Sequence, residues 1–297
     1  MYLLVAKQLI IMALIAVISF FFSKKHHYGE NESRYLSNLL LFVISPCLIL
    51  NTFTIPFTVE KLTAIGISMI VSFITLTLMS ILTMLFIHSK TEIGKSRDCL
   101  DKMALIYSNA GFIGIPLING VFGSEGVFLL MGYIVVFNLF LWIQGIYFVT
   151  GRISPKRIIT NPNIIAVIGG IILFLLPLQL PSVLTQTTKM IGDLNSAIAM
   201  IILGMLFANF KKPVKGEKAP SLRITKVMLL RLLVLPLVVL LVFKVLHLYV
   251  FPSEAHRMIL MIIFIVAACP VAMNVANFAV LYDKDESYGS LLVAISS

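Results

Sequence analysis

The feature that most constrains this chain is a series of long apolar runs. Nine of them are about 20 residues long, the length that an α-helix needs to cross the hydrocarbon core of a bilayer. They lie near residues 3–22, 35–54, 62–87, 101–122, 125–149, 163–180, 183–208, 226–250 and 256–281. Charged residues make up only 12% of the chain, which is too few to cover a water-soluble particle. The sequence therefore predicts an all-α membrane protein.

The two ends of the chain need separate interpretation. The first run contains no basic residue before Lys7 and ends in two lysines, so we expect a span and not a signal peptide. A tenth apolar segment covers the 11 residues from Ser287 to Ser297, which is about 16 Å of helix. Because this length is too short to cross a bilayer, the tenth helix is either a half-span or a truncated helix that lacks about 10–15 residues, and we expect the second.

The distribution of basic residues predicts the orientation. Connections 1–2, 3–4, 5–6, 7–8 and 9–10 carry 17 Lys and Arg, whereas the alternate connections carry only Lys61 and Arg257. Basic connections stay in the cytoplasm, so the N-terminus is expected outside a cell (inner) membrane. The net charge of +10 is then a topology signal, and no nucleic acid is expected as a partner. Lys7, Arg231 and Lys244 lie near run ends and are expected to snorkel to the interface.

Runs four and nine differ from the others because each combines a proline with nearby asparagines. Run four holds Ser108, Asn109, Gly111, Gly114 and Pro116, and run nine holds Pro270, Asn274 and Asn277. Proline removes a backbone donor and clashes with the preceding turn, so each run is expected to divide into two half-helices, the second beginning after its proline. Within a bilayer, such unwound backbone must be buried by protein or line a watery cavity.

The two breaks occupy matching places in two halves of the chain. Residues 1–150 and 151–297 each contain five apolar segments, and an odd number per half makes the halves inverted, so the breaks can meet. Paired breaks of this kind are typical of the substrate site of a carrier. Half-helix N-termini and neutral amides favour a small anion, particularly a carboxylate. The alternative is a pair of ordinary proline kinks, which is how we interpret Pro46 and Pro236.

Asp193 is the one acidic residue inside a run and away from its ends, and Asn195 lies beside it. Together they are a candidate site for a coupling Na⁺ or H⁺. Lys189 stands four residues before Asp193, so an ion pair between the two explains the aspartate as well. Neither break contains an acidic residue, which argues against a sodium–proton antiporter that titrates there.

Motifs of catalysis are missing from the sequence. It contains no H-E-x-x-H, no G-x-S-x-G and no P-loop motif, so we predict neither an enzyme nor an ATP-driven pump. Cys47, Cys99 and Cys269 have no paired spacing, which gives neither a disulfide framework nor a zinc site. We expect no cofactor and no metal.

The order and spacing of these motifs resemble the auxin efflux carrier family, in particular its short bacterial members, often called malate permeases. The resemblance covers almost the whole chain and is most specific in residues 108–117 and 268–274, with a weaker match at Leu203-Gly204. It implies ten helices in two inverted five-helix repeats, with crossed broken helices four and nine, a fold similar to bile-acid symporters.

The same resemblance implies a division of labour. Helices one, two, six and seven would form a scaffold, and the other six a transport domain that moves like an elevator. Asn109, Pro116, Pro270 and Asn274 match the crossover positions of the family.

The sequence therefore predicts a secondary carrier for small organic anions such as malate or auxin-like acids, working by alternating access. The alternative is a symporter or antiporter of related fold that couples transport to Na⁺ or H⁺ at Asp193. A non-transporting membrane receptor or assembly factor is a remote third class. The expected partners are the organic anion, the lipid bilayer, Na⁺ or H⁺ in the coupled alternative, and a second copy of the chain in a homodimer.

Overall fold

The computed structural model describes residues 2–28, 30–54, 56–89, 92–152, 159–176, 180–208, 221–245 and 254–297. These residues form helices, with no strand among them apart from one isolated bridge. The first half contains α1 (Tyr2–His26), α2 (Glu30–Leu39), η1 (Leu40–Ile44), α3 (Ser45–Thr52), α4 (Val59–Phe86), α5 (Glu92–Ile106), η2 (Ala110–Gly114), α6 (Ile115–Phe140), η3 (Leu141–Gly145) and α7 (Ile146–Thr150). The second half contains α9 (Pro162–Leu175), α10 (Ser182–Asp193), α11 (Asn195–Ala208), α12 (Ser221–Leu229), η4 (Leu230–Val234), α13 (Leu235–Val245), α14 (Glu254–Ala268), α15 (Asn274–Leu281) and α16 (Glu286–Ser296).

Within the described residues, helices occupy all nine predicted runs, and α16 occupies the tenth apolar segment. Five continuous helical stretches of this part of the chain are long and apolar enough to cross a membrane. They are Asn31–Thr52, Val59–Phe86, Ala110–Thr150, Ser182–Met205 and Leu222–Val245. The protein is therefore an all-helical, multi-pass membrane protein.

The helix kinks between runs four and five at Gly123. The backbone there has φ 66° and ψ −160°, a conformation that residues with a Cβ rarely adopt. This residue separates the last turns of run four from the part of run five that lies in α6; run five continues through η3 and α7.

Three prolines lie in helices that continue past them. Pro46, Pro116 and Pro236 each follow a π-helical turn, η1, η2 and η4 respectively. A π-turn widens the hydrogen-bonding register, which accommodates the missing proline N–H and relieves the clash with the preceding carbonyl. The interpretation of Pro46 and Pro236 as isolated kinks agrees with this. Pro116 behaves in the same way, so the prediction that run four breaks after Pro116 is wrong.

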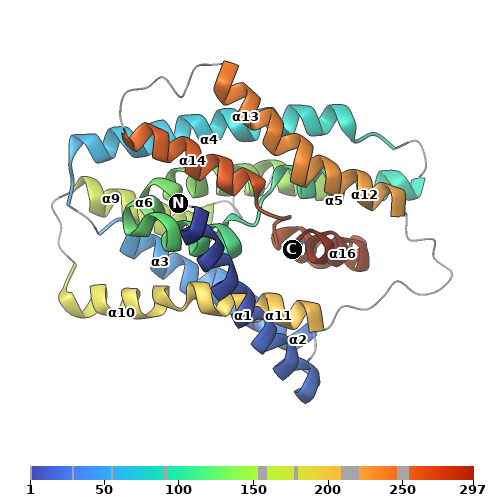
Figure 1. The fold of residues 1–297 in the computed structure, drawn as a ribbon, viewed down its shortest axis with the longest axis horizontal. Coiled ribbons are helices and arrows are strands. Elements are labelled where there is room, and N and C mark those ends of the chain that lie inside the picture. Colours follow the sequence, from blue (N-terminus) through green and yellow to red (C-terminus); the bar gives the residue numbers. More distant parts are fainter. Residues whose placement is uncertain are drawn as a thin grey trace.

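The helices fall into two groups (Figure 1). In the first, α1 packs against α11, and α3 packs against α9 and α10; we call α1, α2, η1, α3 and α9–α11 the scaffold-side group. In the second, α4 packs against α6 and α14, and α15 packs against α16; we call α4–α7, η2–η4 and α12–α16 the crossover group. The first contacts are reciprocal, because the first helix of each half packs against the second helix of the other half.

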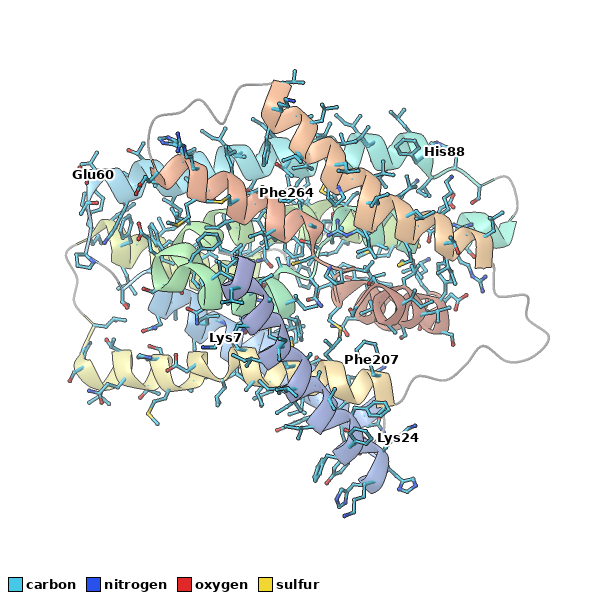
Figure 2. The ribbon with its side chains drawn as sticks, in the orientation of Figure 1. Lys7, Lys24, Glu60, His88, Phe207 and Phe264 are labelled. Carbon is cyan, nitrogen blue, oxygen red and sulfur yellow. The ribbon has the colours of Figure 1, made fainter. Side chains whose placement is uncertain are left out.

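Connections that are rich in basic residues lie together. Figure 2 shows Lys24 and His88 toward one end of the molecule and Glu60 at the opposite end. Ion pairs join three of these connections: Arg223, just before run eight, contacts Asp98 and Asp101 at the start of run four, and Arg97 pairs with Asp285 before α16. The alternation of basic and non-basic connections in the sequence therefore has a spatial counterpart.

The Asp98 carboxylate is held in its charged form. Burial opposes its ionisation, but hydrogen bonds from Ser89 and Arg223 outweigh this effect, so the pKa of Asp98 lies below its ordinary value. Arg223 also donates to the Ser89 hydroxyl at 2.9 Å and to the Gly94 carbonyl at 3.1 Å. This arginine fastens the start of α12 to the beginning of α5.

Arg231 corrects a second prediction. Lys7 and Lys244 are exposed, as expected of snorkelling side chains. Arg231 is fully buried in η4, with 0% of its surface exposed. The helix that carries it begins earlier than the apolar run did, and its apolar stretch extends from Leu222 to Val245. Arg231 thus lies well inside this helix, out of reach of the interface.

Candidate functional site

The site is built where the two broken runs cross. α5 ends at Ile106 and η2 begins at Ala110, so residues 107–109 form the first break. α14 ends at Ala268 and α15 begins at Asn274, so residues 269–273 form the second, which contains Pro270 as predicted. The breaks pair as an antiparallel bridge between Ser108 and Val271.

Two backbone hydrogen bonds flank this bridge. The Asn109 amide donates to the Pro270 carbonyl at 2.8 Å, and the Ala272 amide donates to the Tyr107 carbonyl at 2.9 Å. Unwound backbone in an apolar interior must find such partners, because an unpaired peptide group is costly there. Each break therefore satisfies the other, and the prediction that the two breaks meet is confirmed.

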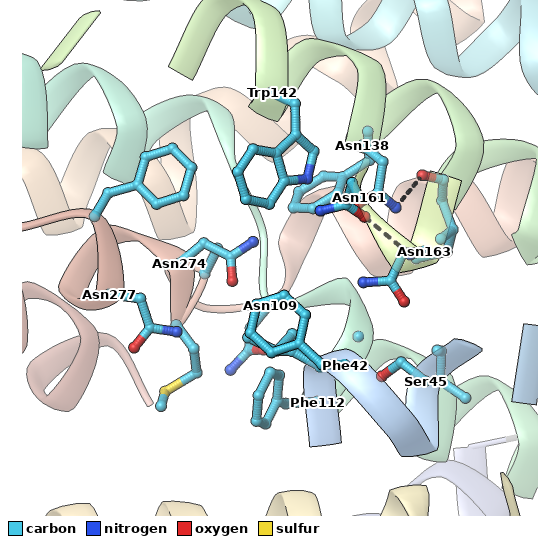
Figure 3. Close-up of a pocket in the computed structure, with 18 of the residues that line it drawn as sticks. Phe42, Ser45, Asn109, Phe112, Asn138, Trp142, Asn161, Asn163, Asn274 and Asn277 are labelled. Atoms are coloured by element: carbon cyan, nitrogen blue, oxygen red, sulfur yellow. Dashed lines mark hydrogen bonds between the residues drawn. The ribbon is translucent and has the colours of Figure 1, made fainter. Parts of the chain in front are cut away.

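A cavity of about 310 Å³ lies beside the crossing. Figure 3 shows asparagines converging on it from several helices, with Asn274 and Asn277 on one side and Asn138, Asn161 and Asn163 on another. In all, the cavity lining includes Asn38, Asn109, Asn138, Asn161, Asn163, Asn274 and Asn277. Its apolar wall includes five aromatic side chains, those of Phe42, Phe112, Phe137, Trp142 and Phe278.

The described lining of the cavity contains one basic residue and no acidic residue. Arg34 lies at the edge of the cavity and is exposed, as is Asn38, so the cavity reaches the surface there. Among the described lining residues none is acidic. An amide lining with one cation can bind an anion without the repulsion that a carboxylate would cause.

Two buried amide atoms in this lining lack a partner among the described residues: Nδ2 of Asn109 and Oδ1 of Asn163. The Asn109 side chain is 2% exposed. A buried donor without a hydrogen bond costs about 1–3 kcal/mol. The unsatisfied Asn109 amide is thus a donor available to a ligand or water in the cavity.

Three helix N-termini border the same space. The π-turn η2 begins after Asn109, α15 begins at Asn274, and α9 begins after Asn161. Asn161 caps α9 with its side-chain oxygen, which accepts from the amides of Asn163 and Ile164. Helix N-termini carry partial positive charge and free amides, the same features that bind phosphate and carboxylate groups elsewhere.

Five of the eight predicted substrate-binding residues line the cavity, and three do not. Ser108, Asn109, Gly111, Asn274 and Asn277 all line the cavity. The other three predicted residues, Gly114, Pro116 and Pro270, are not among its lining residues. A Cβ at Gly114 would contact Val266 of α14 at 3.4 Å, so this glycine serves the packing of the half-helices. Pro270 faces a separate apolar cavity of about 930 Å³ between α1, α11 and α14.

Asp193 and Asn195 lie outside the cavity lining. Asp193 is 61% exposed, and its carboxylate accepts from Lys189 at 2.7 Å, which is the ion pair foreseen from the spacing. Asn195 is buried, and its amide lies 3.4 Å from both the Ser45 hydroxyl and the Gly111 carbonyl. Asn195 thus supports two lining residues from behind.

Sequence reasoning missed most of the lining. Arg34, Asn38, Asn138, Asn161, Asn163 and Trp142 were not predicted. The polar triplet Asn161-Pro162-Asn163 at the start of run six was a usable signal, because proline after a capping asparagine marks a helix start. For Asn138, an amide inside a long apolar run was the available sign.

Comparison with known proteins supplies the family. A family model described as "membrane transport protein" matches residues 4–154 and 148–297, which together cover almost the whole chain. No curated protein matches the sequence. In the described part of the chain, no group of three or more His, Cys, Asp or Glu could hold a metal ion. The chain belongs to the membrane transport protein family, the family of the auxin efflux carriers, and is therefore a membrane transporter.

Proposed function

We propose that the protein is a secondary carrier for small organic anions, carboxylates such as malate or auxin-like acids, bound at the crossing of the two breaks. The observation that carries the proposal is the cavity lined by seven asparagines and no described acidic residue. Three helix N-termini and the unpaired Asn109 amide turn donors toward it. This arrangement suits a carboxylate, because amide donors and helix N-termini stabilise negative charge without a fixed counter-ion.

The cavity also supports an elevator mechanism. Its lining comes from both helix groups: Asn38, Phe42 and Asn161 belong to the scaffold-side group, and Asn109 and Asn274 to the crossover group. A substrate held by the crossover group against the scaffold-side group is carried across when one group slides past the other. We assign the moving part to the crossover group because it holds both breaks.

The exposed edge of the cavity indicates which side is open. Arg34 belongs to the basic connection between the first two spans, which the charge distribution assigns to the cytoplasm. We therefore propose that the structure represents the state open to the cytoplasm, in a cell membrane with the N-terminus outside. A cation at this edge raises the local concentration of anionic substrate.

The direct test is flux of radiolabelled carboxylates into proteoliposomes, after a thermal-shift screen across dicarboxylates, monocarboxylates and indole acids. Asn109→Ala and Asn274→Ala should each reduce flux of the best ligand at least ~10-fold, since each loses a hydrogen bond to a charged group worth about 1.5–3 kcal/mol. Asn119→Ala is the matched control, because Asn119 is an exposed asparagine of α6, in the half-helix that follows Asn109. Unchanged flux in both cavity variants would show that the substrate does not bind at this cavity. Absence of binding and flux for every acid would show that the protein does not carry organic anions.

A further inference from the structure

Arg231 is a fully buried cation next to the crossing of the two breaks. From η4, its guanidinium donates to the Leu105 carbonyl at 3.0 Å and to the Cys269 carbonyl at 2.7 Å. Leu105 is the penultimate residue of α5, and Cys269 directly follows α14. One side chain thus contacts the ends of both half-helices that lead into the breaks.

The two contacts have a common physical reason. The last carbonyls of a helix lack intrahelical partners and carry partial negative charge. At this crossing two such ends converge, and the planar fork of arginine can donate to both at once. Among the described residues Arg231 forms no ion pair with a carboxylate. Its charge is therefore balanced only by helix ends and other dipoles.

Arg231 also lies close behind the cavity wall, although it is not part of the lining. It lies within electrostatic range of Tyr133, whose hydroxyl lies 2.9 Å from the Ser108 hydroxyl. Ser108 lines the cavity and forms one side of the bridge between the breaks. Arg231 itself is not among the lining residues, so direct binding of substrate is not its role.

We propose that Arg231 is a positioning residue of the transport site. It holds the ends of α5 and α14 at the separation that lets the two breaks pair, and it adds positive potential behind the Ser108 side of the cavity. The first part stands on the geometry alone, and the second rests on the proposed carriage of anions.

The geometric part is tested by crosslinking across the breaks. The bonds flanking Ser108 and Val271 mark a non-hydrogen-bonded antiparallel pair, whose Cα atoms lie about 4.5 Å apart, a separation that a disulfide can bridge. Ser108→Cys and Val271→Cys are introduced with the three native cysteines replaced by serine. With Arg231 present, an added oxidant should crosslink most of the protein; Arg231→Met should lower the final extent several-fold, whereas Arg231→Lys should give an intermediate extent.

Lys244→Met is the matched control, since it removes an exposed charge from the neighbouring helix α13. Its crosslinking should equal that of the parent protein. An unchanged extent in a folded Arg231→Met protein would overturn the proposal. If this variant does not fold, Arg231→Gln replaces it with the same expected results; if neither neutral variant folds, a lowered extent in Arg231→Lys supports the proposal and an unchanged one contradicts it.

The electrostatic part is tested by binding of malate and lactate, a dianion and a monoanion at neutral pH, to protein with the native Ser108 and Val271. Interaction with a fixed charge scales with the charge of the ligand. Arg231→Met should therefore weaken malate binding at least ~10-fold and lactate binding less, and Arg231→Lys should restore most of the affinity for malate. Equal loss for both anions would contradict the electrostatic role. If the unaltered protein binds neither, the proposed anion specificity is wrong, while the crosslinking result still decides the geometric role.

Discussion

The scaffold-side group and the crossover group are held together by different means. In the scaffold-side group, helices approach through glycines: a Cβ at Gly204 of α11 would overlap the Ala16 carbonyl of α1, and one at Gly192 of α10 would lie 2.9 Å from the Leu48 Cα. In the crossover group, buried polar and charged side chains join the helices, including Asp101, Arg231 and Ser68.

The difference matches what each group contributes to the site. Small residues let membrane helices pack closely through dispersion alone, without directional contacts. Buried polar groups fix geometry because each needs a specific partner. The division is not complete: the Ser19 hydroxyl of α1 donates to the Ile201 carbonyl of α11 at 2.7 Å, and the crossover group uses Gly132 against Ser68, between α6 and α4, and Gly289 against Ala279, between α16 and α15. Its remaining specificity is polar, and it is this group that holds the paired breaks.

The largest expected effect comes from removing a charge from the crossover group. Asp101 is 0% exposed and accepts from Arg223 at 2.6 Å and from the Tyr288 hydroxyl at 2.7 Å. Asp101→Ala leaves the Arg223 Nε donor and the Tyr288 hydroxyl without their acceptor, while Arg223 keeps its pair with Asp98; each donor left unsatisfied should cost about 1–3 kcal/mol. Thermal unfolding in detergent measures this. A change within experimental error would show that polar contacts do not hold this group together.

The next effect belongs to the scaffold-side group. Gly204→Ala forces a methyl against the backbone of α1 and should cost about 1–3 kcal/mol, because neither helix can yield without separating. Gly169→Ala in α9 is the control, since its Cβ would meet only Leu50, at 3.5 Å, an ordinary contact. The two variants are compared by thermal unfolding. Equal stability of the two would refute glycine packing as the device that joins α1 to α11.

A smaller effect separates the two prolines of the broken runs. Pro270 lies in the paired break, so Pro270→Ala frees the unfolded chain and should cost about 0.4–1 kcal/mol of stability. It also permits α14 to extend into the break, which should slow flux several-fold. Pro116 follows a π-turn in a continuous helix, so Pro116→Ala should leave flux nearly unchanged. If the two variants lose flux equally, the position of the first break at residues 107–109 is functionally irrelevant.

The sequence predicts the helices of this protein better than its site. Apolar runs place the helices because this signal is local. The break at residues 107–109 could not be located, because it depends on pairing with residues some 160 positions away. Arg231 was misjudged because its partners are carbonyls of two other helices, which no local pattern reveals. The asparagines of runs four and nine were recognised, whereas Asn161 and Asn163 reach the cavity only through packing of α9 against α3.

The smallest effect is expected at Asp193, which forms an exposed ion pair with Lys189 in the scaffold-side group. Its side chain and that of Lys189 are 61% and 59% exposed, and exposed pairs of this kind contribute about 0.3–0.5 kcal/mol. Asp193→Asn should therefore shift thermal unfolding only slightly and leave carboxylate flux, with its response to Na⁺ and pH, as in the parent protein. Asn119→Ala again serves as the reference for an exposed polar change. Loss of flux together with loss of its Na⁺ or pH dependence would instead make Asp193 a coupling site, and the scaffold-side group would then take part in transport chemically as well as mechanically.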